Sequence, residues 1–417
     1  MAAALLAAVL VVGGALAVIL WPGPDEPAEA VPAPAVTRPP TPFEQSLTRL
    51  EAQAAALTAA DEKAWLAPID SKQPAIVAAF RTIYRNLHGL GVGHVEYHGK
   101  PHVDKAAAGS VRVDATLSYC FKGGSCPPWR AGGHDGPPRI AQVITFTLRG
   151  DKYVITALDK GNVDYLVNPP WQKQQLAFAQ GERVVLATSG SQKKQLKRFL
   201  PIAEKAARVV DRYAAMIGNK QGARYRVYLA DDKAWKSWYG GNKIKWAIGY
   251  AVPLNTVGTD VVLRISKVLE EQDVSVIVQH ELGHVATLAG ITNRDTDDDQ
   301  WLVEGLAEYI GAHPKKPQNT YNRYVLAEAF GERGAPKTIA VPSLTNKSDD
   351  LTVNTLYAMG HYASACMATK FGEPRLMKFA DLILRQGKKP DEASRAAYGK
   401  PFKTVDKGCL SWIKSRV

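Results

Sequence analysis

The sequence predicts an α+β protein, and three observations lead to this fold class. Apolar residues recur at helical spacing in residues 43–66 and again near residues 76–87. Strand-like stretches separated by Gly and Pro clusters follow these two helices. From about residue 181, strands alternate with helices. A chain of 417 residues can bury more than one core, so we expect two domains, residues 43–180 and residues 181–417.

The N-terminal end of the chain is expected to lie at a membrane. Residues 2–21 carry no charge and are almost entirely apolar, and as a helix they would reach roughly 30 Å, the thickness of one bilayer core. We interpret them as an uncleaved, single-pass transmembrane anchor with the bulk of the chain outside the cytoplasm. The alternative is cleavage at Ala28-Glu29-Ala30, which would give a secreted protein. The proline-rich residues 22–42 are interpreted as a semi-rigid linker.

The first domain is expected to contain two helices and then antiparallel strands. Three stretches have the composition of strands: residues 111–121, 141–148 and 153–157. Asp61 and Trp65 lie near the end of the first expected helix. This order of elements resembles the cone-shaped domains of the nuclear-transport-factor-like and cystatin-like folds. No catalytic constellation is expected in residues 43–180.

The second domain begins with a pattern that predicts a mixed sheet. The expected elements are strand 183–187, helix 192–217, strand 225–230, helix 232–239, and strands near 246–252 and 261–265. Ala247 to Ala251 is our candidate for an edge strand, on which an extended peptide can lie by main-chain pairing. A helix over residues 274–289 follows, with Asp273 as its N-cap and Gly290 ending it in a left-handed conformation.

The pentapeptide HELGH supplies a candidate metal site within this last helix. His280 and His284 lie one turn apart on one face, so both imidazoles can reach a single ion. Glu281, between them, is then free to act on a bound water. A hydrolytic zinc site uses three protein ligands and keeps one position open. The carboxylate of Glu304, in the following WLVEGLAEY segment, is the candidate third ligand.

HELGH followed by WLVEGLAEY resembles the gluzincin metallopeptidases and, more narrowly, the peptidase MA-like proteins. The resemblance covers roughly residues 181–417 and implies a zincin-like metallopeptidase domain, with a mixed sheet and a helical lobe, that binds one Zn²⁺ per chain. It implies Glu304 as the third ligand and Glu308 as the acidic residue that orients a zinc histidine. Spacing supports Glu308 as well, because a metal-bound imidazole usually donates its second N–H to a carboxylate. The alternative for Glu308 is a solvated helix glutamate.

The resemblance also implies a donor for the oxyanion that forms during hydrolysis. Relatives with a Y-x-K-G motif use its tyrosine, and the corresponding residue here is Tyr357, although Met359 stands where lysine is usual. His361 lies one turn later on an expected helix over residues 354–371, so it is the second candidate donor. The alternatives are a packed aromatic ring and a surface histidine.

These residues together predict a zinc-dependent metallopeptidase that cleaves a peptide or protein substrate with metal-activated water and Glu281 as general base. One alternative is a catalytically silent zinc-binding scaffold, in which residues 43–180 bind a partner. Glu281 argues against it, because a scaffold needs no base. The other alternative is a zinc amide hydrolase that acts on cell-wall peptide. No G-x-M-E-N segment precedes HELGH, so endopeptidase action is the default expectation.

Cysteine usage and charge bear on the compartment and the partners. An even number of cysteines suits an oxidising compartment. We expect Cys120 to pair with Cys126 and Cys366 to pair with Cys409. The net charge is +12, but the Lys and Arg residues are scattered, so nucleic-acid binding is not expected. Anionic lipid or an anionic cell-wall polymer suits an exported basic protein better.

Overall fold

The structure is a computed structural model that describes residues 38–104, 106–130, 136–161, 168–219, 222–242, 247–255, 258–267, 270–291 and 297–417. Within these ranges the fold is α+β, as predicted, with two β-sheets. The predicted anchor, residues 2–21, and most of the predicted linker, residues 22–42, lie outside the described residues. Every helix inside them is too short or too polar to cross a bilayer.

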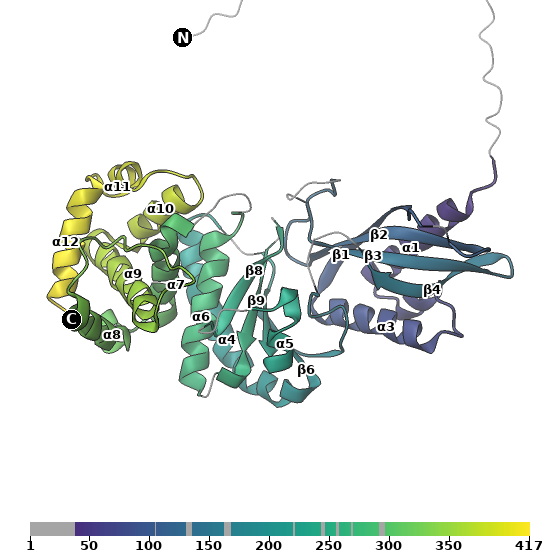
Figure 1. The fold of residues 1–417 in the computed structure, drawn as a ribbon, viewed down its shortest axis with the longest axis horizontal. Coiled ribbons are helices and arrows are strands. Elements are labelled where there is room, and N and C mark those ends of the chain that lie inside the picture. The colour runs from purple at the N-terminus through teal and green to yellow at the C-terminus, as the bar shows by residue number, and fades with distance from the viewer. Residues whose placement is uncertain are drawn as a thin grey trace, which may run out of the picture. The chain divides into compact units, whose positions relative to one another are not determined.

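The first sheet is antiparallel, with the strand order β1-β2-β3-β4, and helices α1 and α3 run alongside it (Figure 1). Its strands are β1 (Val92–Pro101), β2 (Ser110–Phe121), β3 (Arg139–Arg149) and β4 (Lys152–Lys160). From residue 38 onward, three helices precede the strands: α1 (Pro42–Thr58), α2 (Glu62–Leu66) and α3 (Pro74–Gly89). Two helices followed by antiparallel strands were expected, but β1 was not among the predicted strands.

The single helix predicted over residues 43–66 is in fact two helices. The first ends before Ala60, which has a φ of 66° in the left-handed region. Asp61 then caps α2, because its carboxylate accepts a hydrogen bond from the Ala64 amide at 2.9 Å. Trp65 of α2 is fully buried, and its indole N–H donates to the carbonyl of Phe80 in α3 at 2.8 Å.

The second sheet is mixed and has the strand order β5-β6-β7-β9-β8. Its strands are β5 (Leu176–Gln180), β6 (Val184–Ser189), β7 (Tyr225–Ala230), β8 (Gly249–Pro253) and β9 (Thr259–Arg264). β6, β7 and β9 are parallel, whereas β5 and β8 pair antiparallel at the two edges. The sheet therefore begins at β5, shortly before the boundary predicted at residue 181. The helix expected over residues 232–239 is only the short α5 (Asp232–Trp235), after which Tyr239 and two glycines adopt positive φ.

The two faces of this second sheet contact different parts of the chain. Side chains alternate between the faces of a strand. Val184 and Leu186 of β6 face the core formed with α4 (Lys193–Met216) and α6 (Glu271–Leu288). Val185 and Ala187 face the opposite way and pack in the core of residues 50–176. The sheet is thus covered on both faces, as its largely apolar parallel strands require.

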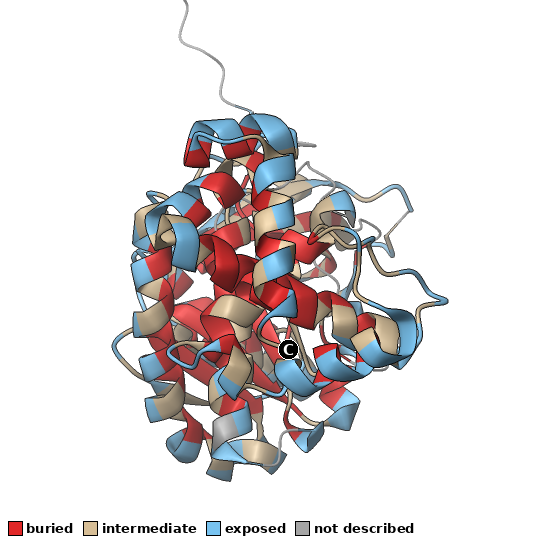
Figure 2. Cartoon of the chain, turned by 90° about the vertical axis from the view of Figure 1, so that its left-hand side faces the viewer, coloured by how far each residue is buried: buried red, intermediate tan, exposed pale blue. Residues whose placement is uncertain are grey.

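The remaining helices form a bundle next to α6. They are α7 (Gln300–Ala312), α8 (Asn322–Arg333), α9 (Asp350–Phe371), α10 (Glu373–Leu384), α11 (Pro390–Tyr398) and α12 (Phe402–Lys414). Figure 2 looks onto this end of the chain, where buried positions gather in the centre and exposed positions surround them. Both predicted disulfides are present: Cys120–Cys126, and Cys366–Cys409 between α9 and α12.

Candidate metal centre

The two histidines of HELGH lie on α6, which packs with one face against the second sheet. The helix begins at Glu271 with Glu270 in the N-cap position, so Asp273 lies in the first turn and is not the cap that we predicted. Gly290 follows the helix with a φ of 80°, in the left-handed region, as expected. His280 and His284 therefore lie in regular helix, one turn apart, and both face α7.

Three donor atoms from α6 and α7 converge at one point. Nε2 of His280 and Nε2 of His284 are 3.1 Å apart. Oε2 of Glu304 lies 3.5 Å from the first nitrogen and 3.3 Å from the second. Ligands at zinc distances on adjacent corners of a tetrahedron are about 3.3 Å apart. The spacing of the three donors therefore fits one tetrahedral ion, and this group could hold a metal ion.

The charges of these donors are complementary. Burial lowers the pKa of His280, but hydrogen bonds to Glu304 and Glu308 outweigh burial, so the pKa of His280 lies well above its usual value. Burial raises the pKa of Glu304, but the nearby His284 and His280 outweigh it, so the pKa of Glu304 is lowered. A divalent cation can replace the imidazole proton in this arrangement, because the ion and the proton compete for the same lone pair.

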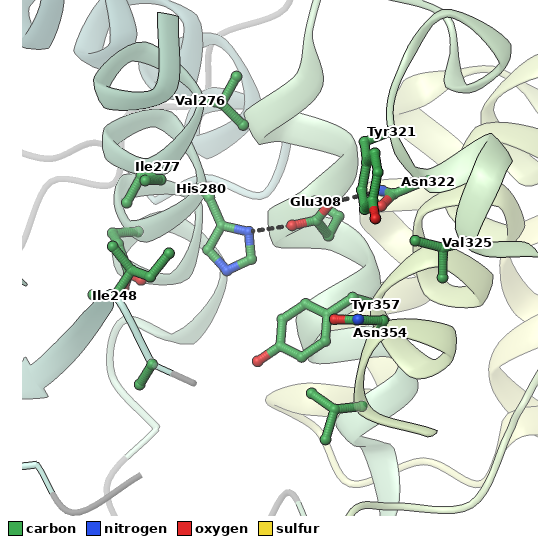
Figure 3. A pocket seen from close by; sticks show the side chains of 14 residues that line it. Ile248, Val276, Ile277, His280, Glu308, Tyr321, Asn322, Val325, Asn354 and Tyr357 are labelled. Atoms are coloured by element: carbon green, nitrogen blue, oxygen red, sulfur yellow. Dashed lines mark hydrogen bonds and ion pairs between the residues drawn. The ribbon is translucent and has the colours of Figure 1, made fainter. Parts of the chain in front are cut away.

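Glu308 contacts the other nitrogen of the first histidine. Nδ1 of His280 lies 3.1 Å from Oε1 of Glu308, and Oε2 of Glu308 accepts a hydrogen bond from Nδ2 of Asn322 at 2.8 Å. Figure 3 shows both contacts as dashed lines. Glu308 is therefore not a solvated helix residue: its carboxylate is held between α6 and α8. Hydrogen bonding from His280 outweighs burial and lowers its pKa.

Glu281 lies at the side of the donor group, next to the edge strand. Its side chain is 6% exposed, and Oε2 has no hydrogen-bond partner among the described residues. Burial raises the pKa of Glu281, against the opposing effect of the two histidines. A Cβ on Gly249 of β8 would collide with the Glu281 carboxylate. Glycine at this position therefore lets β8 approach Glu281 without displacing its carboxylate.

A cavity of about 270 Å³ opens beside these groups. Figure 3 shows His280 on one wall and Tyr357 of α9 on the other. Their rings lie face to face at an interplanar angle of 27°, with centroids 6.2 Å apart. Burial, followed by the charge of Glu304, raises the pKa of Tyr357 well above its usual value, so the phenol keeps its proton. Tyr357 and Glu281 both line the cavity.

His361, the second candidate donor, lies in a different place from Tyr357. Its side chain is 0% exposed, and it is not among the described residues that line the cavity. Its Nδ1 accepts a hydrogen bond from Nδ2 of Asn322 at 2.8 Å. Burial lowers the pKa of His361 to about 4, so the ring is neutral near pH 7. His361 is thus neither a surface histidine nor a wall of the cavity, and it lies behind Asn322.

A second cavity, of about 390 Å³, continues from the first. The two share six lining residues: Ile248, Val276, Ile277, Glu308, Tyr321 and Asn322. Val276 and Tyr321 are exposed, Tyr321 to 73%. The two cavities together form one cleft, which runs from Glu281 and Tyr357 past the rim residue Tyr321.

Two residues of the site did not emerge from sequence reasoning. Asn322 belongs to no motif, and only the fold brings it to Glu308. Gly249 could have been noticed, because an isolated glycine inside an expected strand often marks a close approach of another group. No protein-family model matches the chain, and no curated protein matches it significantly. The geometry of the site is therefore what points to a function.

Proposed function

We propose that this chain is a zinc-dependent peptidase of the gluzincin type. One observation carries the proposal: the donors of His280, His284 and Glu304 converge beside the buried carboxylate of Glu281, at the wall of an open cleft. Two imidazoles and one carboxylate are the ligand set of hydrolytic zinc sites. A structural site would be closed by a fourth protein ligand and would have no use for an adjacent buried base.

The groups around the donors support hydrolysis. A bound zinc ion would polarise a substrate carbonyl and acidify a water molecule. Glu281 is the base: it accepts the proton of the attacking water and passes it to the leaving nitrogen. Tyr357 keeps its proton and faces the same space, so it can donate to the oxygen that gains negative charge. Glu308 holds His280 in the orientation that directs Nε2 towards the donors of His284 and Glu304.

The edge strand supports a polypeptide as the substrate. β8 pairs with β9 on one side and is the last strand in the described order of the sheet. Ile248 and Gly249, at its start, line the cleft next to Glu281. An extended peptide can therefore pair with the outer edge of β8, which no described strand occupies, and place a carbonyl near the donor group. This recognition uses main-chain atoms, so it suits peptide bonds inside a chain.

The two disulfides support an extracytoplasmic location, because such bonds persist in oxidising compartments. In this proposal residues 2–21 anchor the protein in the membrane, or are removed to give a secreted form. Alkylation of the exported protein without reduction, followed by mass spectrometry, is expected to find no modified cysteine. Four alkylated cysteines in that protein would contradict the location.

The proposed activity is tested with Glu281→Gln, which keeps the size of the side chain but removes the base. The variant is expected to hold as much zinc as the wild-type protein and to lose peptide turnover by about 10²- to 10⁴-fold. His284→Ala and Glu304→Ala are expected to lose zinc as well as turnover. Metal content is measured by plasma mass spectrometry, and turnover with a quenched-fluorescent peptide library.

The matched control is Glu328→Gln, which makes the same chemical change at an exposed position of α8. This variant is expected to keep both zinc and activity. A folded wild-type protein that takes up no zinc would refute the proposal. So would a Glu281→Gln variant that cleaves peptides at the wild-type rate.

A further inference from the structure

Asn322, the first residue of α8, joins two side chains that come from two other helices. Its Nδ2 donates to Oε2 of Glu308 in α7 at 2.8 Å and to Nδ1 of His361 in α9 at 2.8 Å. An amide nitrogen carries two hydrogens, so it can serve both acceptors at once. His361 is fully buried, whereas the Glu308 side chain is 21% exposed at the wall of the cleft, so water competes less for these bonds than it would at an open surface.

The chemistry of the two partners fixes the orientation of this amide. An ionised carboxylate only accepts hydrogen bonds, and the opposite orientation would set the oxygen of Asn322 against Glu308. The second partner, His361, is neutral near pH 7 because burial lowers its pKa to about 4. Its Nδ1 accepts from Asn322, so its proton is on Nε2. The Asn322 nitrogen thus has two acceptors and no competing donor.

The consequence for Glu308 is that both of its oxygens are engaged. Oε1 faces Nδ1 of His280 at 3.1 Å, and Oε2 accepts from Asn322. The carboxylate cannot rotate away from His280 without breaking the bond to Asn322. Since Nδ1 of His280 is held by Glu308, its Nε2 is directed to the other donors, 3.1 Å from Nε2 of His284.

We propose that Asn322 is a positioning residue of the metal centre, which sets the affinity for the ion by holding Glu308 against His280. The inference rests on the proposed metal site but not on peptide cleavage. Outer residues that orient a metal-bound histidine typically change the metal affinity by about 10- to 100-fold. Asn322 acts one step further out, so loss of its amide is expected to weaken zinc binding by about 10-fold.

The test uses Asn322→Leu, which keeps the approximate shape of the side chain and removes both donors. The zinc dissociation constant of the full-length protein is measured by competition with a chromophoric chelator, and folding is checked by circular dichroism. Asn322→Leu is expected to bind zinc about 10-fold more weakly than the wild-type protein. Asn322→Ser keeps one donor, so its zinc affinity is expected to lie between those of the wild-type protein and Asn322→Leu. The serine variant replaces the leucine variant in the test if the latter does not fold.

Measuring the same substitution in a Glu308→Ala variant distinguishes a positioning role from a merely structural one. Asn322→Leu is expected to have less than a 2-fold effect on zinc affinity when Glu308 is already replaced by Ala, because the two residues act through one contact. The control Asn354→Ala removes an asparagine that lines the same cleft, and it is expected to bind zinc as the wild type does.

Two outcomes would overturn the inference. One is a wild-type zinc affinity in Asn322→Leu. The other is that Asn322→Leu weakens zinc binding equally whether Glu308 is present or replaced by Ala. Failure of the proposed function looks different, because the wild-type protein itself would then bind no zinc.

Discussion

Gly305 of α7 and Gly360 of α9 lie in direct backbone contact: a Cβ on Gly305 would be 2.5 Å from the carbonyl carbon of Gly360. Two helices can approach this closely only where neither has a side chain. The contact lies one residue from Glu304 and three residues from Tyr357. It therefore determines how far the proposed oxyanion donor stands from the proposed third ligand.

Gly360→Ala is expected to force α7 and α9 apart. The added methyl group meets backbone atoms, including the Trp301 carbonyl, and these cannot move as a flexible side chain can. Overpacking of this kind costs about 1–3 kcal/mol of unfolding free energy, which urea denaturation measures. The control is Gly331→Ala, at a helical position in α8 with no atom near the added methyl group. That variant is expected to be unchanged or stabilised by up to about 1 kcal/mol.

His361 is expected to make the stability depend on pH. Its pKa falls from 6.5 in the unfolded chain to about 4 in the fold because it is buried. Between these values the unfolded state binds a proton that the folded state does not. The contribution of His361 is therefore fully present above pH 6.5 and is lost as the pH falls towards 4. Its size is up to about 3 kcal/mol.

The comparison of the wild-type protein with His361→Gln isolates this contribution from the carboxylates that titrate in the same range. Glutamine can accept from Asn322 but does not titrate. Unfolding free energies are measured at intervals from pH 7.5 to pH 4.5, and the variant is expected to lose less stability than the wild type. Parallel pH profiles for the two proteins would mean that His361 titrates normally.

The exposed rim of the cleft is expected to influence substrate choice. Tyr321 and Tyr324 are similarly exposed, to 73% and 70%, but only Tyr321 is among the residues that line the cleft. Burial of an aromatic ring against an apolar substrate side chain contributes about 1.5–3 kcal/mol. Tyr321→Ala is therefore expected to lower kcat/KM at least 10-fold for peptides with a bulky apolar residue near the cleaved bond. Tyr324→Ala is the control, and equal effects of the two variants would rule out this role.

The two disulfides are expected to differ in their contribution to stability. Cys366–Cys409 closes a separation of 43 residues, whereas Cys120–Cys126 closes one of 6. By loop entropy the first contributes about 4 kcal/mol and the second about 2 kcal/mol. Paired Cys→Ala variants at each bridge, compared by chemical denaturation, measure the difference. Equal losses would show that loop entropy does not control these two bridges.

The metal donors could be predicted from the sequence because their placement is local. His280 and His284 are separated by one helical turn, so any regular helix brings them together. Glu304 lies on the next helix along the chain. Both disulfide pairings were also predicted correctly. The edge position expected for Ala247 to Ala251 agrees with β8, which begins at Gly249.

The features that sequence reasoning missed depend on contacts distant in the chain. β1 contains Gly93, Gly99 and Pro101, which are unfavourable in strands, yet pairing with β2 along its length, interrupted only by a register shift at Gly93, makes it a strand. Helical spacing placed Tyr357 and His361 on one face, but the packing of α8 against α9 leaves only Tyr357 in the cleft. Asn322 reaches Glu308 because α8 returns to α7, which no local pattern encodes.

The second sheet is covered on both faces, and it therefore separates the cleft from the first domain. The cleft lies on the α6 side, whereas residues 50–176 pack against the other side. Packed layers stand roughly 10 Å apart, so residues 50–176 form a separate layer on the side of the sheet opposite the cleft. A molecule that bound to residues 50–176 would therefore not have to displace a substrate from the cleft.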